Sequence, residues 1–292
     1  MFLNSIAITI DNNYVQHACV MLRSLDVNIP SAVNVYCIYD GLSHRNISRM
    51  RREFKKSHIN LHFVAFDNTL LPPQLPLKST DHVTSATFFR IWLPYLLKDL
   101  KQVLFMDSDI VIDGDISEIL NLDVSDHPLA AVPEPGVFTD KKHGLGMRDD
   151  QLYINAGVIL FNLDYFRQKG LTEQISEFLH THPQLCELWD QDAINATIKG
   201  NFYRLDYKFN VQTSFYPAAS IDLLLHKAIK NPVVVHYTGG GDGKPWFYRS
   251  KHPARHLYYK YLRLTSFRFY YPPDLPRSWR IFRKIRFMLL HV

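Results

Sequence analysis

Two aspartates, Asp107 and Asp109, stand one residue apart between two short apolar runs, 103–106 and 110–112. Apolar runs of this length are typical of buried strands, which places the carboxylates at the carboxyl end of a strand. Because a buried ionised carboxylate without a partner costs several kcal/mol, the pair needs a cation, basic side chains or water. Mg²⁺ or Mn²⁺ would suit both carboxylates and would act as a Lewis acid on a departing phosphate. The alternative is a tight turn in which both carboxylates accept backbone amides and face water.

Three further residues could act beside these aspartates. His236 ends the apolar run 233–235, where it is either a metal ligand or a hydrogen-bonded core histidine. Asp11 follows the first apolar run of the chain and Asp190 opens a helical pattern, so each could bind a ligand or cap a helix. Polar residues that follow strands are typical of ligand sites at the carboxyl edge of an open α/β sheet.

The elements that must position these residues alternate in type along the chain. Strand-like or continuous apolar patterns occupy 3–10, 33–39, 61–66, 103–106, 110–112, 154–163 and 233–237. Helical spacing occupies 17–25, 43–56, 84–97, 164–180 and 190–198, with Ser43 as the expected cap of the second helix. Residues 134–150 show no periodicity, which indicates a long loop able to cover a site. This alternation predicts an α/β fold with a mainly parallel central sheet and helices on both faces.

Composition and cysteine content describe an ordinary globular protein. Of its 292 residues, 47% are hydrophobic and 21% are charged, which allows a sizeable core in one main domain with an appendage. Cys19, Cys37 and Cys186 form no C-x-x-C pair, so we expect neither a disulfide framework nor a thiolate zinc site, and a reducing cytoplasm fits best. The N-terminus lacks the pattern of a signal peptide, and no apolar run reaches the roughly eighteen residues of a membrane span.

Short motifs follow one another in a fixed order from Ile8 to Trp246. They are Asp11-Asn12-Asn13-Tyr14, Arg90, Asp107-Ser108-Asp109, Tyr153-Ile154-Asn155-Ala156-Gly157, Trp189-Asp190-Gln191-Asp192, and His236-Tyr237 with Gly239 and Lys244-Pro245-Trp246. In this order they resemble the family 8 retaining glycosyltransferases, particularly the bacterial lipooligosaccharide galactosyltransferases and lipopolysaccharide glucosyltransferases. The resemblance implies a GT-A fold, which is a Rossmann-like α/β/α sandwich, together with a UDP-sugar donor and Mn²⁺. The chain departs from the family pattern by two extra residues between Gly239 and Lys244.

The resemblance also implies a role for each motif residue. At the donor it implies Asp11 and Tyr14 on uracil, Asn13 and Arg90 on the nucleotide or sugar, Ser108, Asn155 and Ala156 along the same site, and Gly239 and Lys244 on the diphosphate. The implied metal ligands are Asp107, Asp109 and His236. A neutral imidazole suits Mn²⁺ better than Mg²⁺, which stays the alternative. The longer loop leaves open which glycine of 239–243 meets the diphosphate.

Asp190 and Gln191 are implied at the donor hexose, with Gln191 beside the anomeric carbon on the face opposite UDP. An amide oxygen is a poor nucleophile beside a carboxylate, so front-face attack through an oxocarbenium-like ion pair is expected. The expected reaction moves Gal or Glc from UDP to a hydroxyl of a growing glycan with retention, and lipopolysaccharide core is the expected acceptor. The alternatives are a transferase acting on a protein or another polymer, and a nonenzymatic carbohydrate- or membrane-binding module that holds a structural metal.

The net charge of +5 lies in the last segment, 265–292, because the rest of the chain holds 27 basic and 27 acidic residues. Beyond several prolines, apolar residues at helical spacing, among them Ile281, Ile285 and Met288, predict an amphipathic helix on an anionic membrane. We therefore expect a GT-A domain at 1–264 with a basic helical tail, peripheral on the cytoplasmic face of the cell membrane beside a lipid-linked glycan acceptor. A tail docked on the body is the alternative. The neutral body argues against a nucleic-acid partner.

Overall fold

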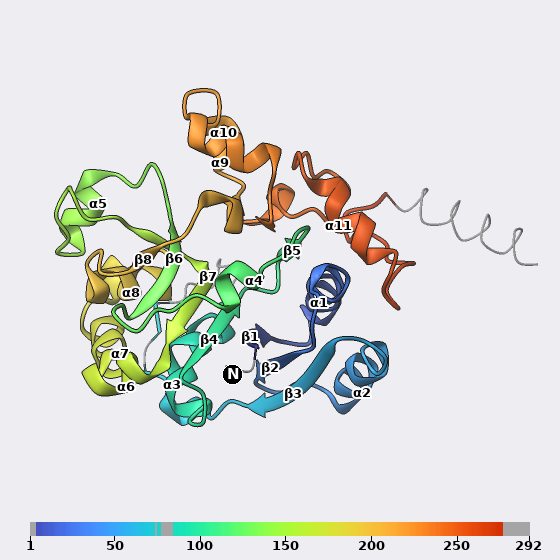
Figure 1. Ribbon diagram of the computed structural model, residues 1–292, viewed down its shortest axis with the longest axis horizontal. Helices are drawn as coiled ribbons and strands as arrows, with labels where there is room; N and C mark the ends of the chain where they lie inside the picture. The colour runs from blue at the N-terminus through green and yellow to red at the C-terminus, as the bar shows by residue number, and fades with distance from the viewer. Residues whose placement is uncertain (1–3, 74, 77–83, 277–292) are drawn as a thin grey trace, which may run out of the picture.

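The computed structural model describes residues 4–73, 75–76 and 84–276, and a seven-stranded sheet runs through its centre (Figure 1). The strand order is β3-β2-β1-β4-β7-β6-β8. The strands are β1 Ser5–Ile10, β2 Val33–Tyr39, β3 Ile59–Ala65, β4 Gln102–Met106, β6 Leu129–Pro133, β7 Ile154–Asn162 and β8 Tyr203–Arg204. β7 is antiparallel to β4 and β6, and the remaining pairings are parallel. The prediction of a mainly parallel α/β sheet is confirmed.

Helices cover both faces of this sheet, because successive strand residues point into two different cores. Ile6 and Ile8 pack with side chains of α1 (Val15–Asn28) and α2 (His44–Glu53), whereas Ala7 between them belongs to the core on the other face. That second core is formed with α3 (Leu93–Leu96), α6 (Leu163–Lys169), α7 (Leu171–Thr181) and α8 (Asp190–Ile198). Burial on both faces explains why the strands read as nearly continuous apolar runs. The result is a three-layer α/β/α arrangement.

A second, three-stranded sheet in the order β5-β10-β9 adjoins the first. Its strands are β5 Ile110–Ile112, β9 Val211–Gln212 and β10 Val234–His236. Three residues lie between the end of β4 and the start of β5, so the segment 107–109 connects the two sheets. β10 pairs antiparallel with β5, in a register that sets His236 opposite Ile110. Around this sheet lie α4 (Ser117–Leu120), α9 (Phe215–Ala218), α10 (Leu223–Lys230) and α11 (Arg255–Leu262), the last of which packs on α1.

The segment predicted as one helix over 84–97 is mostly a 3-10 helix. This 3-10 helix, η2, spans Ser85–Trp92 and is followed by the short α3. Pro94 has no N–H with which to continue an α-helical ladder to the carbonyl of Arg90, and the N–H of Leu93 takes that carbonyl instead. The prediction of helical structure is therefore right and the prediction of a single α-helix is wrong.

Two other predicted segments also need correction. The helix predicted over 164–180 is two helices, because Gly170 adopts a left-handed conformation (φ 60°) that ends α6 and precedes α7. The segment 134–150, predicted as a loop, contains the short helix α5 (Thr139–Gly144). By contrast, Ser43 caps α2 as predicted, since its side chain accepts the N–H of Asn46.

Residues 265–276, the first part of the predicted tail, lie against the body. Thr265 and Leu275 are buried, and the carboxylate of Asp274 accepts the backbone N–H groups of Tyr248 (2.6 Å) and Arg249 (2.9 Å). The amphipathic helix predicted beyond residue 276 lies outside the described residues, and the division after residue 264 stays a prediction. In the described part of the chain, every helix is too short or too polar to cross a bilayer.

Candidate active site

Polar side chains gather in a cleft at the carboxyl ends of β1 and β4. Two adjoining cavities of about 130 and 320 Å³ form this one cleft, because both are lined by Tyr14, Thr87, Arg90, Asp107 and Asp109. Ligand sites commonly measure roughly 300–1,000 Å³. The other predicted residues that line the cleft are Asp11, Ser108, Asn155, Ala156, Asp190, Gln191, His236, Gly239 and Lys244. Asn13 is exposed and does not line it.

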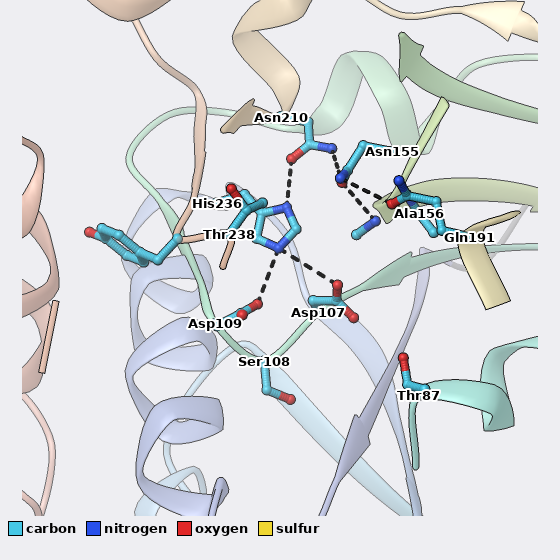
Figure 2. A network of polar contacts seen from close by, with 12 residues as sticks. Thr87, Asp107, Ser108, Asp109, Asn155, Ala156, Gln191, Asn210, His236 and Thr238 are labelled. Carbon is cyan, nitrogen blue, oxygen red and sulfur yellow. Dashed lines mark hydrogen bonds and ion pairs between the residues drawn. The ribbon is translucent and has the colours of Figure 1, made fainter. Parts of the chain in front are cut away.

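Asp107, Asp109 and His236 form a cluster of potential metal ligands, whose donor atoms all lie within 4.8 Å of one another. Figure 2 shows the ring of His236 above the two carboxylates. Its Nε2 atom lies 3.6 Å from Oδ2 of Asp107 and 3.3 Å from Oδ1 of Asp109. These residues come from the segment between the two sheets and from β10. The pairing of β10 with β5 is what brings them together.

The hydrogen-bond network decides which ring nitrogen of His236 carries the proton. The backbone N–H of Gly157 donates to Asn155 Oδ1 (3.0 Å), so the group of Asn210 that meets the same oxygen at 2.9 Å must be its NH₂. The oxygen of Asn210 is then the atom 3.0 Å from His236 Nδ1, which must carry the proton (Figure 2). Nε2 is left to face the two carboxylates, as a metal-ligating histidine requires.

Gly157 lies directly against this cluster. A Cβ atom at that position would stand 2.1 Å from His236 Cε1 and 2.9 Å from Asp107 Oδ2, closer than any real contact. The glycine therefore lets the imidazole and the carboxylate approach each other. The sequence motif contained this residue, but only the structure gives its physical reason.

Asp109 is held as an anion chiefly by the ammonium group of Lys244. Burial alone would raise its pKa, but the charge of Lys244 and the contact with the His236 ring outweigh this effect and hold the pKa well below its usual range. The ammonium group of Lys244 pairs with Asp109 Oδ2 and donates to the carbonyl of Tyr237 (2.7 Å). The other carboxylate oxygen, Oδ1, is buried and has no hydrogen bond to the described residues. This set of groups fits a divalent metal ion. It consists of two carboxylates, one of which has a buried oxygen without a hydrogen bond, and an imidazole whose Nε2 atom faces them.

Arg90 connects the metal cluster to Asp190. Its Nη2 atom lies 3.1 Å from Asp107 Oδ1 and its Nε atom 2.8 Å from Asp190 Oδ2, although the N–H of Nε points at the carbonyl of Thr87 (3.0 Å). Burial raises the pKa of Asp190 to about 6, against the opposing charge of Arg90. Asp190 is thus an ion-pair partner and the first residue of α8, whose N-cap position is Trp189, so Asp190 does not cap the helix.

The amide of Gln191 is fixed in one orientation at the floor of the cleft. Its Oε1 atom accepts the backbone N–H of Ala156 (3.0 Å) and the side chain of Asn155 (3.2 Å). Its NH₂ group donates to Glu134 (3.1 Å) and to the hydroxyl of Tyr153 (3.3 Å). Both lone pairs of the oxygen are therefore occupied, which makes this atom a poor nucleophile.

One end of the cleft begins at the turn after β1. Asp11 Oδ1 accepts the N–H groups of Asn13 (2.8 Å) and Tyr14 (3.0 Å), so this carboxylate shapes the turn into α1 while it also lines the cleft. The ring of Tyr14 packs edge-on against Trp246, with centroids 6.0 Å apart. Burial, reinforced by the charge of Asp109, raises the pKa of the Tyr14 phenol, so it stays neutral.

Ser108 and Gly239 complete the set of predicted residues in the cleft. The hydroxyl of Ser108 donates to the carbonyl of Thr9 (2.7 Å), which joins the segment between the two sheets to β1. Gly239, with φ of 82°, is the residue of the glycine-rich stretch 239–243 that lines the cleft.

Sequence reasoning missed several residues of this site, among them Thr87, Glu134 and Asn210. Thr87 lines both cavities, and its hydroxyl donates to Asp190 (3.1 Å). Glu134 follows β6, and its carboxylate accepts hydrogen bonds from the side chains of Gln191 (3.1 Å) and Asn155 (3.2 Å). Its position directly after a buried apolar strand was a signal that the sequence offered. Asn210 carries the contact between His236 and Asn155, and nothing in its sequence neighbourhood indicated this.

A model of the family described as glycosyl transferase family 8 matches residues 5–250. The chain belongs to glycosyl transferase family 8. Family 8 enzymes use a UDP-sugar and a divalent metal ion, and the Asp-Asp-His cluster gives this chain a place for the ion. Membership makes the protein a glycosyltransferase, so the alternative of a nonenzymatic binding module is wrong.

Similar proteins extend over most of the chain. General stress protein A of Bacillus subtilis is 29% identical over 268 residues, which cover 88% of this chain and 92% of that protein. The lipopolysaccharide 1,3-galactosyltransferase of Salmonella typhimurium is 30% identical over 186 residues, which cover 61% of this chain and 54% of that protein. The solved structure of an active-site mutant of LgtC matches with a TM-score of 0.80 at 22% identity and covers 94% of this chain and 99% of that one. This similarity confirms the expected GT-A fold for the present chain.

Proposed function

We propose that this family 8 enzyme transfers Gal or Glc from a UDP-sugar to a hydroxyl of a growing glycan with retention of the α configuration. The observation that carries the proposal is the cluster of Asp107, Asp109 and His236, which shares one cleft with Gln191. Lipopolysaccharide or lipooligosaccharide core is the proposed acceptor. Similarity to a lipopolysaccharide 1,3-galactosyltransferase and to the lipopolysaccharide 1,2-glucosyltransferase of Escherichia coli supports this choice.

The donor would lie along the cleft with its uracil between Asp11 and Tyr14, at the end remote from Gln191. Asn13 is proposed to reach the nucleotide, and Ser108 to hold the backbone beside it. Asp107, Asp109 and His236 would hold Mn²⁺, which when bound neutralises charge that develops on the departing diphosphate. Mg²⁺ is the alternative ion. The backbone of Gly239 and the ammonium of Lys244 add donors for the diphosphate from the opposite wall.

The hexose would lie between Arg90 and α8. Asp190 and the backbone carbonyl of Ala156 would accept hydrogen bonds from its hydroxyl groups, and Asn155 is proposed beside them in the same wall of the cleft. Gln191 is proposed at the anomeric carbon, where its amide oxygen stabilises positive charge as the bond to UDP breaks. Because both lone pairs of that oxygen already accept hydrogen bonds, front-face attack by the acceptor hydroxyl is favoured over a covalent intermediate.

The surroundings of the enzyme are also part of the proposal. We place it on the cytoplasmic face of the cell membrane, with the GT-A domain at 1–264 and with 265–292 as a basic tail that meets anionic lipid. The tail carries the whole net charge of +5, and each cation near such a surface contributes about 1 kcal/mol.

The test is release of UDP from UDP-Gal and UDP-Glc, with Mn²⁺, Mg²⁺ or chelator, followed by transfer to lipopolysaccharide core fragments and to protein acceptors. We expect one donor to be preferred, Mn²⁺ to stimulate release, and core fragments to be the better acceptor. Asp109→Asn should remove the stimulation. Release that does not respond to metal would refute the assigned ligands, and transfer to protein alone would refute the proposed acceptor.

A further inference from the structure

Three exposed aliphatic side chains lie in the turn before α10 and in the first two residues of that helix. Ile221 is 91% exposed, Leu223 85% and Leu224 58%. α10 and the turn before it form an outer end of the molecule (Figure 1). A single exposed leucine is ordinary in a folded protein, but here three such residues lie within four positions. Asp222, between Ile221 and Leu223, turns its carboxylate toward the backbone N–H groups of Leu224 (2.8 Å) and Leu225 (3.2 Å). We refer to these three residues as the apex.

Cationic side chains flank the apex. A recess of about 200 Å³ is lined by Leu224 together with Arg204 and Lys227. Arg204 lies over the ring of Tyr207, 5.4 Å from its centroid, and neither cation forms an ion pair within the described part of the chain. Asp206 also lines the recess, where its Oδ1 atom accepts the N–H of Lys208 (2.9 Å). The recess therefore offers two cations to an anionic group against one acid.

The chain itself keeps the apex close to the active-site cleft. Ser214 lines the cleft, and α9 begins at the next residue, Phe215. Even a fully extended chain from Ser214 to Ile221 would span at most about 25 Å. A surface that touches the apex is thus within reach of the cleft for a glycan of a few sugars.

We propose that the apex and its basic recess form a membrane-contact surface, in which Ile221, Leu223 and Leu224 enter the interface of an anionic bilayer. Arg204 and Lys227 then meet lipid phosphate groups, because their stems suit apolar surroundings while their charges stay at the headgroups. Exposed aliphatic side chains beside cations suit a lipid surface better than a protein partner. Protein–protein binding sites favour aromatic side chains that fill pockets. The inference rests on the proposed function in one respect, the lipid-linked acceptor.

The first experiment places a polarity-sensitive fluorophore on the apex through Leu223→Cys in the full chain. The native residues Cys19, Cys37 and Cys186 are buried, so the label reacts at the introduced thiol. We expect blue-shifted emission with vesicles of phosphatidylcholine and phosphatidylglycerol, quenching by brominated lipid, and little change with phosphatidylcholine alone. Val27→Cys, at an exposed aliphatic position on α1, is the matched control and should not respond.

Three outcomes would overturn the proposal. Unchanged emission from the label at position 223 while the protein sediments with vesicles would show that another surface binds lipid. A shift that grows with protein concentration in the absence of vesicles would show that a second copy of the chain covers the apex. Absence of any vesicle binding would also reject the proposal.

The second experiment removes the apolar tips with Ile221→Ser, Leu223→Ser and Leu224→Ser together. Because these side chains are exposed, the melting temperature should change little, while the vesicle partition coefficient should fall at least about tenfold. Unchanged partitioning would reject the apex as the contact. Release of UDP should be unaffected, since no substituted residue lines the cleft. Vesicle binding without UDP release would instead reject the proposed function and leave the membrane contact standing.

Discussion

The Nδ1 atom of His236 lies 3.0 Å from the Oδ1 atom of Asn210, and this contact turns the other ring nitrogen toward Asp107 and Asp109. Asn210 is completely buried and also donates to Asn155, which bonds to Gln191. One amide therefore orients the ligand of the metal cluster and touches the network that holds the residue proposed at the anomeric carbon. Outer hydrogen-bond partners of this kind typically change metal affinity about 10- to 100-fold.

Asn210→Leu should weaken Mn²⁺ binding by that factor while UDP binding without metal stays close to that of the wild type. The measurement is titration of free Mn²⁺ by electron paramagnetic resonance, with and without UDP. Gln212→Leu is the matched control, because this neighbouring amide is buried without a hydrogen bond to the described residues and should be dispensable. Equal losses in both variants would mean that Asn210 supports the fold only.

Gly157→Ala should abolish Mn²⁺-dependent UDP binding, because the added methyl group would collide with the imidazole of His236 and the carboxylate of Asp107. Calorimetric titration of UDP with and without Mn²⁺ measures the effect. Gly144→Ala is the control, since no atom lies within 4 Å of the position that its Cβ would occupy. Normal metal dependence in Gly157→Ala would show that the ligands do not need the observed approach.

Gln191→Ala should lower turnover by about ten- to a thousandfold and leave the affinity for bare UDP within about twofold, because the proposed contact forms with the sugar as charge develops. Steady-state kinetics and calorimetric titration of UDP separate the two effects. A loss of UDP affinity as large as the loss of turnover would place Gln191 on the nucleotide instead.

His17 should make the protein less stable in acid. Its ring is buried, stacked on Trp246 with centroids 3.6 Å apart, and burial lowers its pKa to about 3. Since the unfolded chain binds this proton near pH 6.5, stability from the neutral ring is complete above that pH and is lost as the pH falls toward 3. Between pH 7 and pH 4 this group should contribute a loss of about 3 kcal/mol.

The variant His17→Phe keeps an aromatic ring and removes the titrating group. Its free energy of unfolding should therefore fall less between pH 7 and pH 4 than that of the wild type, as measured by urea denaturation at both values. Parallel pH profiles for the two proteins would contradict the assignment. The change in unfolding free energy between the two pH values is compared rather than its absolute size, because the variant loses the hydrogen bond to Tyr258 at both pH values.

A chain that ends at residue 276 should stay folded, keep UDP release, and bind anionic vesicles at least about tenfold more weakly at low salt. The cut belongs after residue 276, since Leu275 is buried and the carboxylate of Asp274 accepts two backbone N–H groups of the body. Sedimentation with vesicles measures binding, and circular dichroism checks the fold. Undiminished vesicle binding would remove the tail from the membrane contact.

The sequence by itself determined the local elements and the chemistry of the candidate ligands. The range of α8, 190–198, and that of β2, 33–39, were both correct, because apolar periodicity and a polar start are local features. Asp107 and Asp109 stood out because apolar strands flank them, and the ordered motifs pointed to the family that the comparison confirmed.

Only the tertiary structure decided how distant residues meet. The pairing of β10 with β5 brings His236 to Asp109, and the antiparallel placement of β7 beside β4 and β6 sets Gly157 against both. Strand order, register and the partners of buried amides such as that of Asn210 depend on contacts between segments far apart in the chain. Local periodicity carries no information about these contacts, since the same alternation of strand and helix suits several strand orders.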